Sequence, residues 1–170
     1  MTEPARDDVP ALAWSTDNCT VGRAMAILGE RWAFVVLREV FNGVRRFEDI
    51  RSHGGIPRQV LSDRLALLVD HGILARVPYR PEGQRERHEY RLTPKGFDLY
   101  PVLVAIADWG ATYVADPAGP PVEFAHRGCG AVVHAELVCE DGHPVPGRRD
   151  VAPRPASGAK PLQSTSAAAR

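Results

Sequence analysis

The sequence of 170 residues has no net charge, too few cysteines for a disulfide framework and no apolar run long enough to cross a bilayer. Its most apolar stretch, residues 99–115, is interrupted by Pro101 and Asp108, which argues against a transmembrane helix there. Residues 1–10 are acidic and lack the basic start and apolar core of a secretory signal, so we expect a cytoplasmic protein. In that reducing compartment the three cysteines are expected to be free thiols, metal ligands or redox sensors.

The sequence also contains none of the common catalytic motifs. A phosphate-binding loop, a dinucleotide fingerprint, a nucleophile elbow and an HExxH pattern are all absent. A catalytic pair of Cys19 with a histidine has no sequence feature that would orient it. We therefore do not expect an enzyme.

The zero net charge conceals a division of charge along the chain. Residues 19–96 carry fourteen basic and nine acidic side chains, a net charge of +5, whereas residues 97–145 carry a net charge of −6. The basic segment is the part of the chain that could face phosphate groups.

Composition and turn residues divide the chain into four parts. Residues 1–17 and 146–170 are rich in proline and alanine and are expected to be a disordered N-terminal arm and a disordered tail. Residues 18–115 show regular apolar periodicity and form the predicted main domain. Residues 116–145 begin with a proline-rich linker and form a small extension in which two short strands, a β-hairpin, are expected.

Apolar residues at helical spacing predict four helices in the first part of the main domain. Glycines mark helix ends there, because glycine accepts the left-handed backbone conformation that follows a helix. Leu61, Leu65 and Leu68 form the apolar face of the fourth helix, and Pro57 lies near its first position. The expected helices run from near Cys19 to Gly29, over residues 31–43, over residues 45–53 and over residues 57–72.

The pattern then changes period. Alternating residues over 73–80 and 87–93 predict two strands joined by a polar, basic loop, which together make a β-hairpin. Thr93 as N-cap and Pro94 at the first position begin a long helix that is expected to run to about Tyr113. A kink is expected at Pro101, which lacks the N–H that would bond Phe97.

A short helix, a glycine turn and a second helix followed by a hairpin is the order of a winged helix-turn-helix, so the fold class is mainly α with a small β-hairpin wing. In this fold the second helix of the pair enters the major groove of DNA, and its first turns meet base edges. The base-reading candidates, which lie opposite the leucine face, are Arg58, Gln59, Ser62 and Asp63. The candidates for phosphate and wing contacts are Arg45, Arg46, Arg51, Arg85 and Arg87.

An alternative interpretation remains open for this polar face. Any one of these arginines could belong to a solvated surface with no ligand, although the whole arrangement argues against that for the set. The alternative function is a winged-helix protein-interaction module that does not bind DNA. A DNA-binding regulator should bind its own promoter with an affinity that falls steeply as salt rises, whereas an interaction module should show no such dependence.

Four stretches carry a resemblance to a known family: CTVGRAMAILGERW, LREVFNGVRRFEDI, GGIPRQVLSDRLALLVDHGIL and HEYRLTPKG. They resemble the HxlR-type winged helix-turn-helix transcriptional regulators of bacteria, over residues 19–113. The resemblance implies a homodimer on a pseudo-palindromic double-stranded operator, with the first helix and the long C-terminal helix at the interface. Pro57 and Gln59 depart from the serine and lysine common in the family, which affects the expected base contacts and not the binding mode.

A dimer is also indicated by the residues themselves. The long C-terminal helix is apolar on more than one face, through Leu99, Val102, Leu103, Ile106 and Trp109 among others. One small domain cannot bury all of that surface, and an exposed apolar patch of this size usually marks a partner. The alternative is that the C-terminal extension covers it.

Two kinds of regulatory input are candidates for a dimeric repressor of this type. Cys19 precedes the first helix, at the position of a cysteine that senses oxidants in some family members, and a helix start favours a reactive thiolate. The interpretation that the sequence favours is nevertheless a small apolar residue packed at the dimer interface. A small-molecule effector could bind between the long helices and the DNA-binding core, in a pocket lined by Trp32, Phe34, Trp109 and Tyr113, although such aromatics are more often core residues.

The extension contains a candidate zinc site, although no cofactor is expected to be required. His126 and Cys129 are three residues apart, and Cys139 and His143 four apart, which are plausible spacings for zinc ligands. Gly142 stands where a second cysteine of the latter pair is expected from family members with such extensions, so His143 would replace it. A degenerate hairpin that has lost its metal is the alternative.

Overall fold

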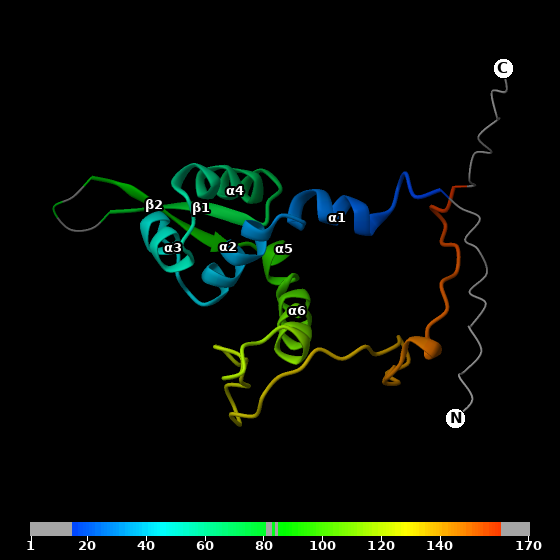
Figure 1. Ribbon diagram of the computed structural model, residues 1–170. Helices are drawn as coiled ribbons and strands as arrows, with labels where there is room; N and C mark the ends of the chain where they lie inside the picture. The colour runs from blue at the N-terminus through cyan, green and yellow to red at the C-terminus, as the bar shows by residue number, and fades with distance from the viewer. Residues whose placement is uncertain (1–14, 81–82, 84, 161–170) are drawn as a thin grey trace, which may run out of the picture.

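The computed structural model describes residues 15–80, 83 and 85–160. The outer parts of the predicted arm and tail, residues 1–14 and 161–170, lie outside the described residues. Figure 1 shows the wing and α1 at opposite ends of the helix-turn-helix body, with α6 and the extension beside it. The elements in chain order are α1 (Thr20–Leu28), α2 (Arg31–Phe41), α3 (Phe47–Gly54), α4 (Arg58–Asp70), β1 (Leu74–Tyr79), β2 (Arg87–Leu92), α5 (Pro94–Phe97), α6 (Tyr100–Tyr113) and the 3-10 turn Arg148–Asp150.

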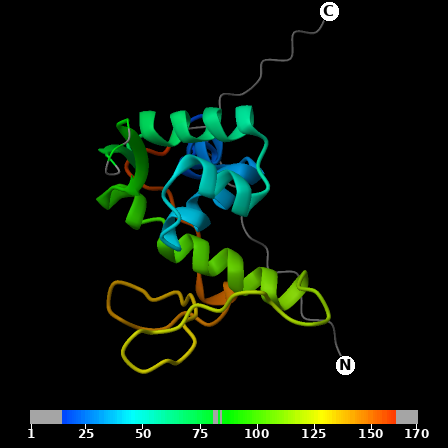
Figure 2. The same ribbon diagram turned by 90° about the vertical axis from the view of Figure 1, so that its left-hand side faces the viewer.

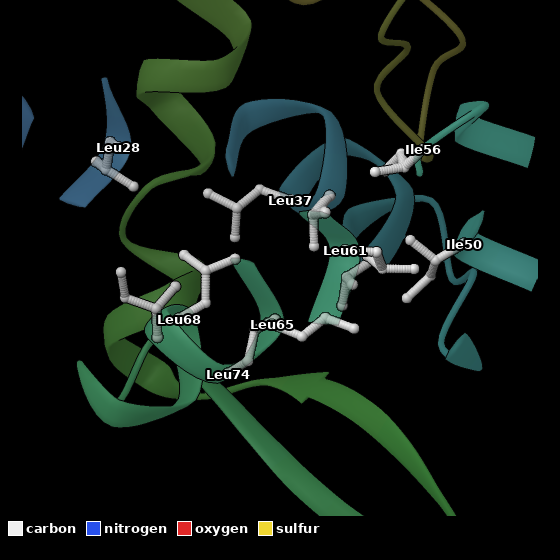
Figure 3. Packing of buried hydrophobic residues seen from close by; sticks show 11 residues of the cluster. Leu28, Leu37, Ile50, Ile56, Leu61, Leu65, Leu68 and Leu74 are labelled. Atoms are coloured by element: carbon white, nitrogen blue, oxygen red, sulfur yellow. The ribbon is translucent and has the colours of Figure 1, made fainter. Parts of the chain in front are cut away.

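The core forms around α2, which packs against α1, α3, α4, β2 and α6. The predicted leucine face of α4 is confirmed, because Leu61, Leu65 and Leu68 are each at most 1% exposed. Figure 3 shows these leucines directed at Leu37 of α2 and Ile50 of α3. Burial of this apolar surface fixes the orientation of α4 and leaves its opposite face in solvent.

The glycine signals for helix ends are confirmed. Gly55, at φ 63°, follows α3 in the left-handed conformation, and Gly72, at φ 65°, follows α4. The N–H of Ile73 then donates to the carbonyl of Leu68 at 2.9 Å, and the buried Ile73 packs against the core. The turn between α3 and α4 is therefore determined locally, by Gly55, whose left-handed conformation only glycine adopts without strain.

The predicted hairpin is confirmed as an antiparallel pair with Leu74 opposite Leu92 and Tyr79 opposite Arg87. Its base is joined to the start of α3, because the N–H of Tyr90 donates to the carbonyl of Arg45 at 2.8 Å. The bridge between Arg46 and Glu89 continues this link. The wing is thus held in a defined position relative to the helix-turn-helix.

The long C-terminal helix differs from its prediction. The Thr93 side chain accepts a hydrogen bond from the N–H of Gly96, which confirms the expected N-cap, but α5 ends at Phe97. A new helix, α6, begins at Tyr100 with Pro101 in its first turn. Because Pro101 has no N–H to bond Phe97, the chain breaks into two helices instead of bending as one.

The C-terminal extension forms two turns closed by isolated bridges, and the predicted short strands are not formed in the described residues 116–145. Asp108 of α6 anchors it by accepting a hydrogen bond from the N–H of Ala135 at 2.8 Å. The described part of the predicted tail runs back to the first described residue, Ser15, whose N–H donates to the carbonyl of Lys160 at 2.7 Å. Among the described residues, none of the helices combines the length and apolar character that a bilayer crossing requires.

Candidate nucleic-acid interface

The exposed face of α4 carries the four base-reading candidates. Arg58, Gln59, Ser62 and Asp63 are all exposed, while the leucines on the other side of the helix hold it to the core. Figure 2 shows α4 along one side of the molecule, on the side opposite the extension. No side chain caps the N-terminus of α4, where Pro57 is the N-cap residue. Its first backbone N–H groups are therefore available to an anion such as a phosphate.

Arg58 is held in place by the neighbouring helix. Its Nη1 donates to Glu48 Oε1 at 2.6 Å, and its guanidinium lies over the ring of Phe47, 5.1 Å from the centroid. Arg51 Nε donates to the other oxygen of Glu48 at 2.7 Å. These hydrogen bonds, first from Arg51 and then from Arg58, hold the pKa of Glu48 below its usual range.

Two further side chains of α4 contact each other. Gln59 Nε2 donates to Asp63 Oδ1 at 2.9 Å, a pair at the i, i+4 spacing of one helix face. Arg58, Gln59 and Ser62 line an open hollow of about 340 Å³ together with Phe47. The structure thus brings the base-reading candidates together on one surface.

The phosphate candidates extend this surface toward the wing. Arg46 and Arg87 line a second open hollow of about 370 Å³, which shares Phe47 with the first. Arg45 and Arg85 are exposed, and Arg85 lies next to wing residues outside the described residues. Arg51 is partly exposed, and its guanidinium is paired with Glu48.

Sequence reasoning missed several residues of this surface. Arg76 of β1 lines the second hollow, and its Nη2 lies 3.2 Å from His88 Nδ1. Arg46 stacks over the ring of Tyr79, 4.9 Å from the centroid. The hairpin register places these residues together, and an alternating sequence pattern alone does not determine that register.

A buried carboxylate near the turn was also missed. Glu39 of α2 is fully buried, and its Oε2 lies 2.5 Å from His53 Nδ1 of α3. Arg38 binds the other oxygen of Glu39 through Nε, at 2.9 Å, and through Nη2. A buried charge must be paired, so this cluster links α2 to the last turn before Gly55.

The four aromatic candidates for an effector pocket do not lie together. Trp32 and Phe34 pack against the core, whereas the rings of Trp109 and Tyr113 contact each other, 5.4 Å apart, on the exposed side of α6. A cavity does lie between α2 and α6, but other residues line it. Cys19 is the half-buried N-cap residue of α1.

The four metal-ligand candidates form two separate pairs. His126 Nδ1 lies 3.2 Å from Cys129 Sγ, and His143 Nδ1 lies 3.6 Å from Cys139 Sγ. Figure 1 shows the two turns apart, the first in yellow and the second in orange. Within the described residues, the group with metal-ligand spacing is Cys139, Asp141 and His143, whose ligand atoms lie within 4.8 Å of one another. The structure therefore groups Cys139 and His143 with Asp141 rather than with His126 and Cys129, and zinc binding by the extension stays a prediction.

Comparison with protein families places the helix-turn-helix among known sequences. Residues 27–117 match the family described as HxlR-like helix-turn-helix. An HTH-type transcriptional regulator of Mycobacterium tuberculosis is 44% identical over 141 residues, which is 83% of this chain and 88% of that protein. An HTH-type transcriptional regulator of Bacillus subtilis, YvaP, is 34% identical over 99 residues, 56% of this chain and 87% of that protein.

Two solved structures are similar in fold. PA1607, named as a candidate transcription factor, gives a TM-score of 0.71 at 33% identity and covers 81% of this chain and 95% of its own. PA1374 of Pseudomonas aeruginosa gives a TM-score of 0.57 at 29% identity, over 84% of this chain and 95% of its own. Matches of this length extend beyond residue 117 into the extension, which lies outside the family match.

Proposed function

This chain belongs to the HxlR-like helix-turn-helix family and is a DNA-binding transcriptional regulator, and on that basis we propose that it is a dimeric repressor. The observation that carries the proposal is the surface formed by the start of α3, the first turns of α4 and the wing, on which Arg46, Arg58, Gln59 and Arg87 lie. A chromosomal operator is the ligand, so the protein acts in the cytoplasm, by binding and without turnover of a substrate.

The residues divide the recognition between base edges and backbone. Arg58 and Gln59 have the side chains that bind guanine and adenine through two hydrogen bonds each. Arg46, Arg76 and Arg87 lie toward the wing, where they would contact phosphates and fix the position of α4 in the groove. Arg58 exchanges an exposed ion pair with Glu48 for a base contact, and exposed pairs are weak enough for that exchange to favour DNA.

The proposed dimer uses α1 and α6. Trp109 and Tyr113 are 60% and 70% exposed, and Val21 and Met25 of α1 are also exposed. Large apolar side chains grouped in this way on two helices support burial against a second copy of the chain. A two-fold dimer would place two α4 helices on half-sites one turn of DNA apart, about 34 Å.

Regulation of the repressor is proposed through a small-molecule effector, with thiol oxidation as the second candidate. Cys19 supports the second input only by its place at the start of α1, beside the proposed dimer interface. If diamide relieves repression in cells with the Cys19→Ser variant as it does with the unmodified protein, Cys19 is restricted to packing; repression that persists in the variant alone would support oxidation at Cys19.

The test is fluorescence anisotropy with DNA from upstream of the protein's own gene and with a scrambled duplex of equal length. We expect steep weakening with salt, and Arg87→Ala should lower the salt slope by about 1. Arg58→Ala should reduce the preference for the native sequence by roughly 1–3 kcal/mol. Arg127→Ala, on an exposed turn of the extension, is the matched charge control and should change neither.

The alternative, a protein-interaction module, makes the opposite prediction. In that case native and scrambled duplexes bind equally weakly, and Arg58→Ala and Arg87→Ala behave like Arg127→Ala. That outcome would also leave the exposed apolar faces of α1 and α6 to a different protein partner.

A further inference from the structure

A cavity of about 260 Å³ lies between α2, α6 and the start of the extension. Small residues of α6 leave the space open, since Ala107, Gly110 and Ala111 face it while Trp109 is exposed elsewhere. A β-carbon added at Gly110 would meet only Val114, at 3.8 Å. The volume lies just below the range of roughly 300–1,000 Å³ typical of ligand pockets, which indicates a small ligand.

The outer wall of the cavity comes from the extension. Val122 and Phe124 line it, and the ring of Phe124 packs against Tyr100 of α6, 5.8 Å between centroids. Asp108 fixes the next part of the extension through the N–H of Ala135. The family match ends at residue 117, so this wall belongs to a part of the chain that the helix-turn-helix itself does not require.

The polar side of the cavity is formed by one face of α2. Arg38 and Asn42 lie one helical turn apart and are the polar side chains among the lining residues. Nε and Nη2 of Arg38 bind Glu39, whereas its Nη1 has no partner within the described part of the chain. A guanidinium with a donor to spare, beside an amide, matches a carboxylate.

Resting on the proposed function, we propose that this cavity is the effector site and that its ligand is a small aromatic monocarboxylate. The ring would pack against Leu103, Ala107 and Phe124, and the carboxylate would bind Arg38 and Asn42. The lining contains no acidic side chain, so a cationic ligand is disfavoured.

The same arginine connects the cavity to the helix-turn-helix. Arg38 binds Glu39, and Glu39 binds His53 of α3, two residues before Gly55 and the turn into α4. A ligand carboxylate bound at Nη1 draws the guanidinium of Arg38 toward the cavity and so weakens its bonds to Glu39, the buried charge that joins α2 to α3. Ligand and operator are then linked through one contact network, and binding of either weakens binding of the other.

The direct test uses 1-naphthoate as the probe and calorimetry on the full chain. We expect a dissociation constant at or below about 1 mM for 1-naphthoate and at least about tenfold weaker binding of the neutral 1-naphthamide. Arg38→Gln should weaken 1-naphthoate binding by a similar factor, while Arg31→Gln, on the same helix but outside the cavity, should not. Ala107→Leu fills the cavity and should abolish binding.

Equal binding of the acid and the amide to the unmodified protein would overturn the proposal without the use of any variant. Absence of 1-naphthoate binding would do the same, as expected if a second copy of the chain fills the cavity. Retention of 1-naphthoate binding by Ala107→Leu would place the ligand elsewhere.

A second measurement tests the link to DNA. Saturating 1-naphthoate should lower affinity for the native duplex by about fivefold or more, a usual size for such coupling, and have no effect in Arg38→Gln. Unchanged affinity would overturn the link while leaving the site intact. If no specific DNA binding occurs at all, the proposed repressor function fails, and the calorimetric result still decides whether the cavity binds the acid.

Discussion

Replacing Glu48 with glutamine should tighten DNA binding and make it more dependent on salt. Glu48 accepts hydrogen bonds from both Arg51 and Arg58, so its carboxylate neutralises charge on the DNA-facing surface. Its side chain is 57% exposed and that of Arg58 is 73% exposed, so glutamine can replace it without a cavity or a buried unpaired group. The substitution therefore changes charge and leaves the packing of α3 and α4 intact.

The expected magnitude follows from counterion release. One additional effective positive charge steepens the slope of log K against log salt by about 0.9 at most. Between about 200 and 50 mM salt, the ratio of affinities should therefore rise by a further factor of about 3.5 in Glu48→Gln. Anisotropy titrations of the native duplex at these two salt concentrations measure it.

Two control variants make this prediction specific. Glu136→Gln, on the exposed extension, should leave both affinity and slope unchanged. Asp49→Asn is next to Glu48 on α3 but holds no arginine among the described ion pairs, so a smaller effect is expected. An unchanged slope in Glu48→Gln, or an equal increase in Asp49→Asn, would refute the role assigned to the Glu48 pairs.

Three further predictions concern pH, the core and the extension. The pKa of the Glu48 carboxyl should lie below its ordinary value of 4.5, because Arg51 and Arg58 bind it. The stabilisation from these ion pairs is therefore present above pH 4.5 and is lost as pH falls through the lowered pKa. Carboxyl NMR should show that Arg51→Ala raises the pKa of Glu48. Leu65→Ala should lower the free energy of unfolding, measured in urea, by about 2–5 kcal/mol, and a loss below about 1 kcal/mol would contradict the burial of Leu65 in the core. We propose that Cys139, Asp141 and His143 bind zinc. The protein should then compete with a chromogenic chelator for zinc, and Cys139→Ser should abolish this competition while Cys129→Ser retains it. Equal effects of the two substitutions would exclude this three-ligand set.

Much of the helix-turn-helix could be predicted because its signals are local. Gly55 and Gly72 end helices through their own backbone conformation, and Thr93 caps α5 through a contact three residues away. The leucine spacing of α4 likewise determines which face is buried, since the helical period alone places Leu61, Leu65 and Leu68 together. Its exposed face, which carries the base-reading candidates, followed from the same argument.

Other features depend on contacts that sequence spacing does not encode. The break between α5 and α6 was expected as a kink, because Pro101 removes a hydrogen bond without indicating whether the helix bends or separates. The extension was expected to form strands, but its described part is held by side-chain anchors such as Asp108 and forms only bridges. Short apolar stretches between turn residues are compatible with either outcome.

The sequence by itself determined the order of helices and wing, the buried face of α4 and the set of arginines offered to DNA, because each depends on residues a few positions apart. Only the tertiary structure decided how those groups are paired. Glu48 lies ten residues before Arg58, and Glu39 fourteen before His53, yet each pair meets across two helices. Such contacts depend on packing, as does the cavity that brings Arg38 of α2 to the apolar residues of α6 and the extension.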